Sequence, residues 1–330
     1  MKRYSYLTLP LYIVGLVCLI GFGQGCSKSG GESNNSSTPK KLRLAFVTNT
    51  KNDFWATVRY GCNNAAQSLS NVDLDFRFFT GTNAEEQNAI LNELAAKGVD
   101  GIAVSPIDAE KQAECLNQIS AKTLLICVDS DAPASKRAFF IGTDNVLAGT
   151  KAANLLKEAL PKGGKVILFV GYPNAENATA RIQGFTNGLA GADIQVIDTM
   201  SDATQPEVAM KNAQEALSKH SDLAGMVGLY SYNGPALLKA VRSDGKAGQV
   251  KIVCFDDDGQ TLDGIAAGDI YGTVVQLSAR IGYEAISRMD KYLSGDKTQF
   301  ADGSLLLNSL AVNHAMVDAM QAWHQDKLQP

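Results

Sequence analysis

The stretch Leu124–Pro133, LLICVDSDAP, is an apolar run that ends abruptly in acidic and hydroxyl side chains. The apolar part, Leu124 to Val128, is typical of a strand buried on both faces of a parallel sheet. In open α/β sheets, ligands bind outside the carboxyl ends of the strands, where Asp129 and Asp131 would lie. These carboxylates could accept hydrogen bonds from the hydroxyl groups of a small polar ligand. The alternative is an ordinary turn, because Asp, Ser and Pro are common turn residues.

The rest of the chain repeats this rhythm of short apolar runs and amphipathic segments. Leu42–Val47 and Val166–Val170 are examples of predicted strands, and Phe54–Leu69 is a predicted helix with one apolar face. A last strand is expected at Leu305–Leu310 and a last helix at Ala315–His324. Strands that alternate with helices predict parallel sheets covered on both faces. The units are too many for one ordinary sheet, so we expect two α/β domains, with a single (β/α)₈ barrel as the structural alternative.

The composition is that of a soluble globular protein, with 45% hydrophobic and 19% charged residues in a chain of 330. A net charge of −4 and the lack of a long basic run argue against a nucleic-acid partner. Apart from Cys18 and Cys26 near the N-terminus, the cysteines match no zinc-ligand spacing, and we expect no cofactor or metal. We expect free buried thiols at these positions, which are Cys62, Cys115, Cys127 and Cys254.

The first 40 residues differ in character from the rest. Two basic residues precede an apolar run, and small residues then lead to Cys26, which is typical of an export signal. Cys26 resembles a bacterial lipoprotein cleavage site, although Gly23 stands where that pattern usually has Leu. We therefore assign residues 1–26 to export and residues 27–40 to a flexible tether. The expected location is the periplasm or cell envelope with a lipid anchor; plain secretion and an uncleaved anchor are the alternatives.

Polar and aromatic side chains follow several other predicted strands. Phe54 and Trp55 follow the first strand together with Thr48 and Asn52, and one helix cannot bury two adjacent rings equally. Rings beside amide and carboxylate groups suit a sugar, because a ring face covers C–H groups while polar groups bind hydroxyls. The alternative is a helix start capped by Asn52 with Phe54 in the core. Further candidates near strand ends are Arg181, Tyr230, Asp256 and Gln276.

The motifs of common enzyme classes are missing. After residue 26 there is no phosphate-binding loop, dinucleotide fingerprint or nucleophile elbow. The chain has three His, none at a predicted strand end, so metal or His-based chemistry has little support. Asp129 and Asp131 could in principle act as glycosidase acids, but they share one loop and no partner acid is identifiable. We therefore favour a turn with hydroxyl acceptors over catalytic acids at these positions.

Six segments, in order, resemble the periplasmic sugar-binding proteins of ribose-binding type, the substrate-binding components of ABC importers. The resemblance implies an α/β fold of two Rossmann-like lobes with parallel sheets, joined by a three-strand hinge (type I periplasmic binding protein). The six segments are Val47–Trp55 (VTNTKNDFW), Val128–Pro133 (VDSDAP), Phe140–Gly149 (FIGTDNVLAG), Ala180–Phe185 (ARIQGF), Cys254–Gly259 (CFDDDG) and Val275–Tyr283 (VQLSARIGY).

The resemblance also implies lobe boundaries and ligand contacts. The first lobe would comprise residues 41–143 plus 277–306, and the second residues 144–276 plus 307–330. Ser130 replaces an arginine of the ribose binders and Tyr230 an asparagine, so the identity of the sugar stays open. The implied contacts are Thr48, Asn52 and Phe54 in the first binding loop, Trp55 as the stacking ring, Asp129 as hydroxyl acceptor, Arg181 as cleft arginine, Asp256 as second-lobe aspartate and Gln276 as hinge glutamine.

The implied function is capture of a monosaccharide or similar polyol outside the cytoplasm by a monomer that delivers it to an ABC permease. A sensory module that presents the ligand to a membrane receptor is the main alternative. Transcription regulators share the two-lobed body, but no helix-turn-helix pattern precedes it here. A carbohydrate-active enzyme is the remaining alternative.

Overall fold

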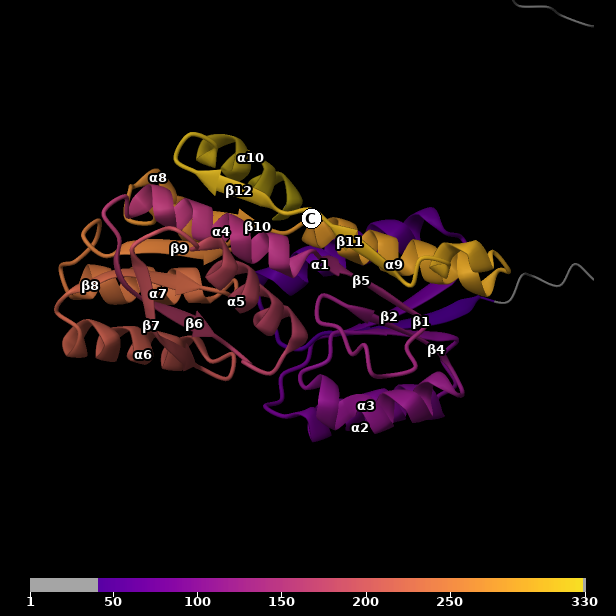
Figure 1. The fold of residues 1–330 in the computed structure, drawn as a ribbon. Helices are drawn as coiled ribbons and strands as arrows, with labels where there is room; N and C mark the ends of the chain where they lie inside the picture. The colour runs from indigo at the N-terminus through magenta and orange to yellow at the C-terminus, as the bar shows by residue number, and fades with distance from the viewer. Residues whose placement is uncertain (1–40, 329–330) are drawn as a thin grey trace, which may run out of the picture. The chain divides into compact units, whose positions relative to one another are not determined.

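The computed structural model describes residues 41–328, in which strands and helices alternate around two sheets (Figure 1). Within this range each sheet has six strands. This arrangement confirms the predicted two-lobed α/β fold and excludes the single barrel. The export segment, residues 1–26 with Cys26, and the tether, residues 27–40, lie outside the described residues.

The first lobe is built on a sheet with the strand order β11-β5-β4-β3-β1-β2, and all of its neighbouring strands are parallel. Helices α1 and α9 cover one face with a shared apolar cluster, and the cluster beside α2 and α3 covers the other. The strands are β1 (Leu42–Val47), β2 (Val72–Arg77), β3 (Gly101–Val104), β4 (Leu124–Val128), β5 (Phe139–Thr143) and β11 (Ser304–Leu307). The helices are α1 (Asp53–Ser68), α2 (Ala84–Ala96), α3 (Ala109–Ser120), α9 (Ser278–Leu293) and the short 3₁₀ helix η1 (Lys297–Phe300).

The second lobe repeats this plan with the strand order β12-β10-β9-β8-β6-β7, in which only the edge strand β12 is antiparallel to its neighbour. Helices α4 and α5 pack on one face of this sheet, and α6, α7, α8 and α10 on the other. The strands are β6 (Gly164–Val170), β7 (Ile194–Ser201), β8 (Leu223–Gly228), β9 (Lys251–Phe255), β10 (Gly272–Val275) and β12 (Leu310–Asn313). The helices are α4 (Asn145–Ala159), α5 (Glu176–Gly188), α6 (Pro206–Lys219), α7 (Asn233–Ser243), α8 (Gly259–Ala266) and α10 (Val317–Leu328).

The central strands are apolar on both faces because helices cover both sides of each sheet. In β4, Ile126, Cys127 and Val128 are 0% exposed, as the continuous apolar run predicts. Burial of each large aliphatic side chain stabilises the fold by about 1.5–3 kcal/mol. The four cysteines of the described residues are free, and three are fully buried while Cys115 is half-buried. The expectation of buried thiols holds for Cys62, Cys127 and Cys254 and is wrong for Cys115. Burial raises the pKa of each of the four thiols.

The chain passes between the lobes at three places that lie side by side. These are the junctions β5–α4, β10–α9 and β11–β12. Thr143 in the first crossing donates to the side-chain oxygen of Gln276 in the second at 2.8 Å. The backbone N–H of Asp144 donates to the carbonyl of Leu307 at 3.1 Å, which joins the first crossing to the third.

Two predicted elements near the C-terminus are wrong in detail. The single strand predicted at Leu305–Leu310 is two strands, because β11 pairs with β5 in the first sheet and β12 with β10 in the second. The last helix begins at Val317 and not at Ala315, after a turn at residues 314–316. None of the helices between residues 41 and 328 is both long and apolar enough to cross a membrane.

Candidate functional site

The loops that follow β4 and β9 hold an aspartate at the same position in each lobe. Asp129 and Asp256 have left-handed backbones, with φ of 61° and 69°. Each donates its backbone N–H to the neighbouring strand, at 2.9 Å to Ile141 and 2.9 Å to Val274. This region is uncommon for residues other than glycine, and Asp adopts it more often than most. Both side chains line the same cavity, which is described below.

Asp129 is the centre of a hydrogen-bond network that joins the lobes. Its Oδ2 accepts from Ser105 Oγ in the first lobe and from Asn177 Nδ2 in the second, each at 3.1 Å. Its Oδ1 lies 4.0 Å from Nη2 of Arg181. Burial raises the pKa of Asp129, and the Arg181 charge and these hydrogen bonds partly offset that rise.

Arg181 is held by α5 in a fully buried position, with 2% of its surface exposed. Its backbone lies against Gly149 of α4, where an added Cβ would be 2.1 Å from the Arg181 carbonyl oxygen. Nε donates to Asn145 Oδ1 at 2.9 Å and Nη1 to the Leu229 carbonyl at 2.6 Å. The guanidinium also sits 4.5 Å from the centre of the Phe255 ring. Nη2 is left without a hydrogen-bond partner, so this donor is available to a ligand oxygen.

Asp256 connects the cavity to the hinge. Gln276, in the second crossing, donates from Nε2 to Asp256 Oδ1 at 2.9 Å. Thr273 Oγ1 donates to the Asp256 carbonyl at 2.7 Å, which fixes the loop backbone. Burial raises the pKa of Asp256 to about 7, with Arg181 opposing the rise. The protonation of this carboxyl therefore changes near neutral pH.

The start of α1 contributes amide and aromatic groups to the cavity. Asn52 caps the helix by accepting from the Trp55 backbone N–H at 3.2 Å. Trp55 is only 1% exposed, and its indole N–H donates to Asn49 Oδ1 at 3.0 Å. Phe54 meets Trp55 edge to face, with ring centres 4.9 Å apart. The helix-cap reading is confirmed, because Asn52 caps α1 and Phe54 packs in the core. The expectation that one helix cannot bury both rings is wrong, since Phe54 and Trp55 are 6% and 1% exposed. Both rings also line the cavity, and their contact with a sugar stays a prediction.

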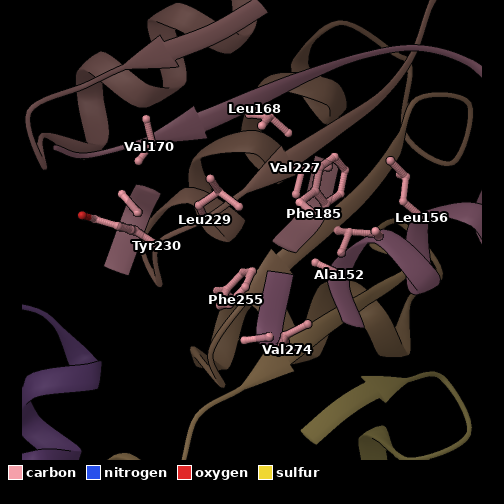
Figure 2. Packing of buried hydrophobic residues seen from close by; sticks show 14 of the residues in the cluster. Ala152, Leu156, Leu168, Val170, Phe185, Val227, Leu229, Tyr230, Phe255 and Val274 are labelled. Carbon is pink, nitrogen blue, oxygen red and sulfur yellow. The ribbon is translucent and has the colours of Figure 1, made fainter. Parts of the chain in front are cut away.

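Tyr230 closes the second-lobe side of the cavity. Its hydroxyl donates to Asn177 Oδ1 at 3.3 Å, so the Asn177 amide nitrogen faces Asp129. Figure 2 shows Tyr230 at the edge of the apolar cluster, with its oxygen pointing away from the other labelled side chains. Burial raises the pKa of Tyr230 well above its usual value, so the phenol stays a neutral donor.

These side chains line a small cavity of about 30 Å³. Both lobes and the hinge contribute to its wall. The lining residues are Asn49, Thr50, Asn52, Phe54, Trp55, Asp129, Asn177, Arg181, Tyr230, Ser231, Asp256 and Gln276.

Eight of the ten candidate ligand contacts named from the sequence line this cavity, and Thr48 and Asp131 do not. Thr48 is a structural residue, since its hydroxyl donates to the Thr50 carbonyl and accepts from the Phe79 backbone N–H. Asp131 is bound by Arg137, whose Nη2 donates to Oδ2 at 2.5 Å and whose Nε donates to Oδ1. The sequence left open whether Asp131 contacts ligand or belongs to the turn, and its geometry favours the turn.

The sequence analysis missed four lining residues, Asn49, Thr50, Asn177 and Ser231. Each follows or lies near a strand end, which was the signal used for the other candidates. Asn177 was the harder case, because it lies on a helical turn and contacts Asp129 only through the folding of both lobes.

The cavity offers carboxylate acceptors, a guanidinium donor, amides and aromatic rings, but no arrangement for metal binding. Within residues 41–328 no group of three or more His, Cys, Asp or Glu side chains could hold a metal ion. Such a set of groups suits a small ligand that carries several hydroxyl groups.

Comparison with known proteins agrees with this geometry. A family model described as a periplasmic binding protein domain matches residues 44–297. The ribose import binding protein RbsB of Salmonella typhimurium is 25% identical over 263 residues, which cover 78% of this chain and 87% of the relative.

Solved structures show the same fold. A glucose-galactose binding protein from Geobacillus stearothermophilus superposes with a TM-score of 0.78 at 25% identity, covering 84% of this chain and 98% of the other. An ABC transporter solute binding protein from Burkholderia graminis, in complex with D-arabinose, has a TM-score of 0.79 at 26% identity, with coverage of 84% and 96%. The family match over most of the chain, on this two-lobed fold, shows that the protein belongs to the periplasmic binding proteins.

Proposed function

We propose that this protein captures a neutral monosaccharide or a similar polyol outside the cytoplasm and delivers it to an ABC permease. The observation that carries the proposal is the cavity between the lobes, where Asp129 of the first lobe faces Arg181 and Asp256 of the second. Carboxylates accept hydrogen bonds from ligand hydroxyls, while the Nη2 donor of Arg181 suits a hydroxyl or ring oxygen.

Contacts from both lobes favour a closed form of the protein. A ligand that binds Asp129 and Asp256 at once interacts better with the closed arrangement than with an open one, so binding shifts the population toward closure. A permease can then distinguish loaded protein from empty protein. Three relatives named for ribose, for glucose and galactose, and for D-arabinose support a monosaccharide as the ligand class.

A sugar panel tests the proposal directly. The chain has two Trp, so the Trp323→Phe variant leaves Trp55 as the only tryptophan. Its fluorescence should change on titration with at least one of D-ribose, D-arabinose, D-galactose and D-glucose. The same sugar should raise the melting temperature, because ligand at 100 times Kd stabilises a protein by about 2.7 kcal/mol.

D-Ribose 5-phosphate is the matched negative ligand. The cavity holds two carboxylates and one guanidinium, so a phosphate on the ligand should be repelled and binding should be lost. No response to any neutral sugar in either assay would contradict the proposed ligand class. Unchanged uptake of the bound sugar by cells that lack the protein would contradict delivery to a permease.

The remaining parts of the proposal concern catalysis, the anchor and the oligomeric state. We expect no turnover, so the bound sugar should give an unchanged NMR spectrum after long incubation with the protein. The basic and apolar N-terminal run and Gly25-Cys26 support an export signal followed by lipidation of Cys26. Mass spectrometry of the mature N-terminal peptide should show lipid on Cys26, and Cys26→Ser should release a monomer from the membrane fraction.

A further inference from the structure

The three consecutive acids after β9 point to three different places. Asp256 lines the cavity. Asp258 caps α8 by accepting from the backbone N–H of Gln260 at 2.9 Å. Asp257 reaches α10 instead, where its Oδ2 lies 3.3 Å from Nδ1 of His324. This contact joins the ligand-binding loop to the last helix of the described chain.

The Asp257–His324 pair is buried, which sets it apart from the surface ion pairs. Asp257 is 5% exposed and His324 is 7% exposed. A buried hydrogen bond that involves a charged group contributes more to stability than an exposed one. The imidazole also lies close to the loop backbone, because its Nε2 is 3.6 Å from where a Cβ on Gly259 would be.

Helix α10 lies beyond the region that matches the family model, which ends at residue 297. It packs on α8 and β12 of the second lobe and also contacts α1 of the first lobe. Helix α1 carries Asn52, Phe54 and Trp55 at its start, so α10 touches an element of the site in each lobe. A separate surface bond runs from Gln321 Nε2 to Asp263 Oδ1 at 2.9 Å and does not involve the loop.

We propose that His324 is a positioning residue for the ligand site: through Asp257 it holds the loop after β9 so that Asp256 faces the cavity. This inference rests on the proposed function in that the held residue is a ligand contact. The left-handed backbone of Asp256 is unfavourable for a residue with a side chain, so it persists only where neighbours hold it. Bonds from β10 hold one side of the loop, and His324 holds the other.

The test compares four variants of the full chain by three measurements. His324→Leu removes the polar contact, while His324→Asn keeps an amide that can donate from near the Nδ1 position. Asp257→Ser removes the acceptor and leaves α10 intact, which covers the case in which His324→Leu does not fold. Gln321→Ala is the matched control, since it removes a bond of α10 that does not reach the loop. The measurements are the amide exchange of the peptide covering residues 254–262, the melting temperature, and the Kd for D-ribose and D-arabinose.

In His324→Leu and Asp257→Ser, loop amide exchange should rise about tenfold, and the affinity for whichever sugar binds wild type should fall about tenfold. In His324→Asn, loop amide exchange and sugar affinity should lie within about threefold of wild type. In Gln321→Ala, the same two quantities should lie within about twofold of wild type. A lower melting temperature with unchanged loop exchange would show that His324 only stabilises the fold, and would overturn the inference. If neither sugar binds wild type, the proposed function is in doubt, while loop exchange still decides the role of His324.

Discussion

The loops after β4 and β9 are equivalent features of the two lobes. Each follows a strand whose last four residues are buried, begins with an aspartate in the left-handed region, and donates its first N–H to the next strand of the sheet. Each places that first carboxylate in the shared cavity. The equivalence shows that one backbone arrangement at a strand end serves both halves of the site.

The partners of the two aspartates differ. Asp129 is bonded across the cleft to Asn177 and faces Arg181, so its environment depends on how the lobes meet. Asp256 is bonded to Gln276 and its loop to β10 and α10, so it is held by its own lobe and the hinge. The surroundings of Asp129 therefore come from both lobes, whereas those of Asp256 come from its own lobe and the hinge.

The largest expected effect comes from Asp129→Ala. This change removes a ligand acceptor and the acceptor of Asn177, and it leaves the Arg181 charge without a facing carboxylate, so sugar affinity should fall about a hundredfold. Isothermal titration with the sugar that binds wild type measures the loss. The melting temperature should also fall, because Ser105, Asn177 and the buried Arg181 all lose the carboxylate that faces them. Affinity that stays within twofold of wild type would show that the two aspartates are not equivalent ligand contacts.

The second effect is the pH dependence of stability that Asp256 confers. Its folded-state pKa of about 7 lies above the ordinary Asp value of 3.8, so the folded protein holds this proton more tightly than the unfolded chain. The resulting stabilisation is fully present below about pH 4 and is lost as pH rises through about 7. Between pH 5 and pH 8 the free energy of unfolding should fall by about 3 kcal/mol, which is about two pH units at 1.36 kcal/mol each.

Urea unfolding of the ligand-free protein at pH 5 and pH 8 measures this difference. Asp256→Asn should reduce the difference between the two pH values. Asp73→Asn, which changes an exposed carboxyl, should leave that difference unchanged. Part of the difference between pH 5 and pH 8 should remain in Asp256→Asn, because burial also raises the pKa of Asp202 and of Asp258 to about 6 each. If Asp256→Asn shows the same difference between pH 5 and pH 8 as wild type, the Asp256 carboxyl of the wild-type protein is not desolvated as its burial requires.

Tyr230→Phe should have a smaller effect. It removes the hydroxyl that orients the Asn177 amide toward Asp129 and keeps the ring in the second-lobe core. Affinity should fall about fivefold, and the free energy of unfolding should fall by about 1 kcal/mol because a buried neutral hydrogen bond is lost. A hundredfold loss would instead indicate that the Tyr230 hydroxyl is itself a principal ligand contact.

The smallest effect on binding is expected for Asp131→Asn. Asp131 is paired with Arg137 inside the first lobe and does not line the cavity. Affinity should stay within about twofold of wild type, while the free energy of unfolding falls by about 1 kcal/mol. Calorimetry and urea unfolding of one preparation measure both. A large loss of affinity here would restore Asp131 as a ligand contact and would make the first-lobe loop a two-acid site.

Much of the fold was predictable because helices and buried strands leave a direct mark on the sequence. The run Leu124–Val128 has the same bounds in the structure as in the prediction, since an apolar strand of a covered sheet is apolar throughout. The segment at Leu305–Leu310 shows the limit. Its residues all suit a strand, and only the pairing of its halves with different sheets divides it.

The lining of the cavity was predictable where a polar residue follows a strand, and it was not predictable where it depends on contacts between residues far apart in the sequence. Asp129 and Asp256 directly follow apolar strands, so their positions could be recognised from the order of residues along the chain. The partner of Asp131 lies six residues along the chain, and nothing in the spacing distinguishes an ion pair with Arg137 from a ligand contact.

The sequence by itself determined two α/β lobes and a polar site at the carboxyl ends of their strands, because hydrophobic periodicity and the residues after each strand are local properties. Only the tertiary structure decided which acids face the cavity, that Asn177 bridges the lobes, and that His324 supports the loop after β9. These are contacts between residues 48 and 67 positions apart, and such contacts exist only once both sheets and the hinge have formed.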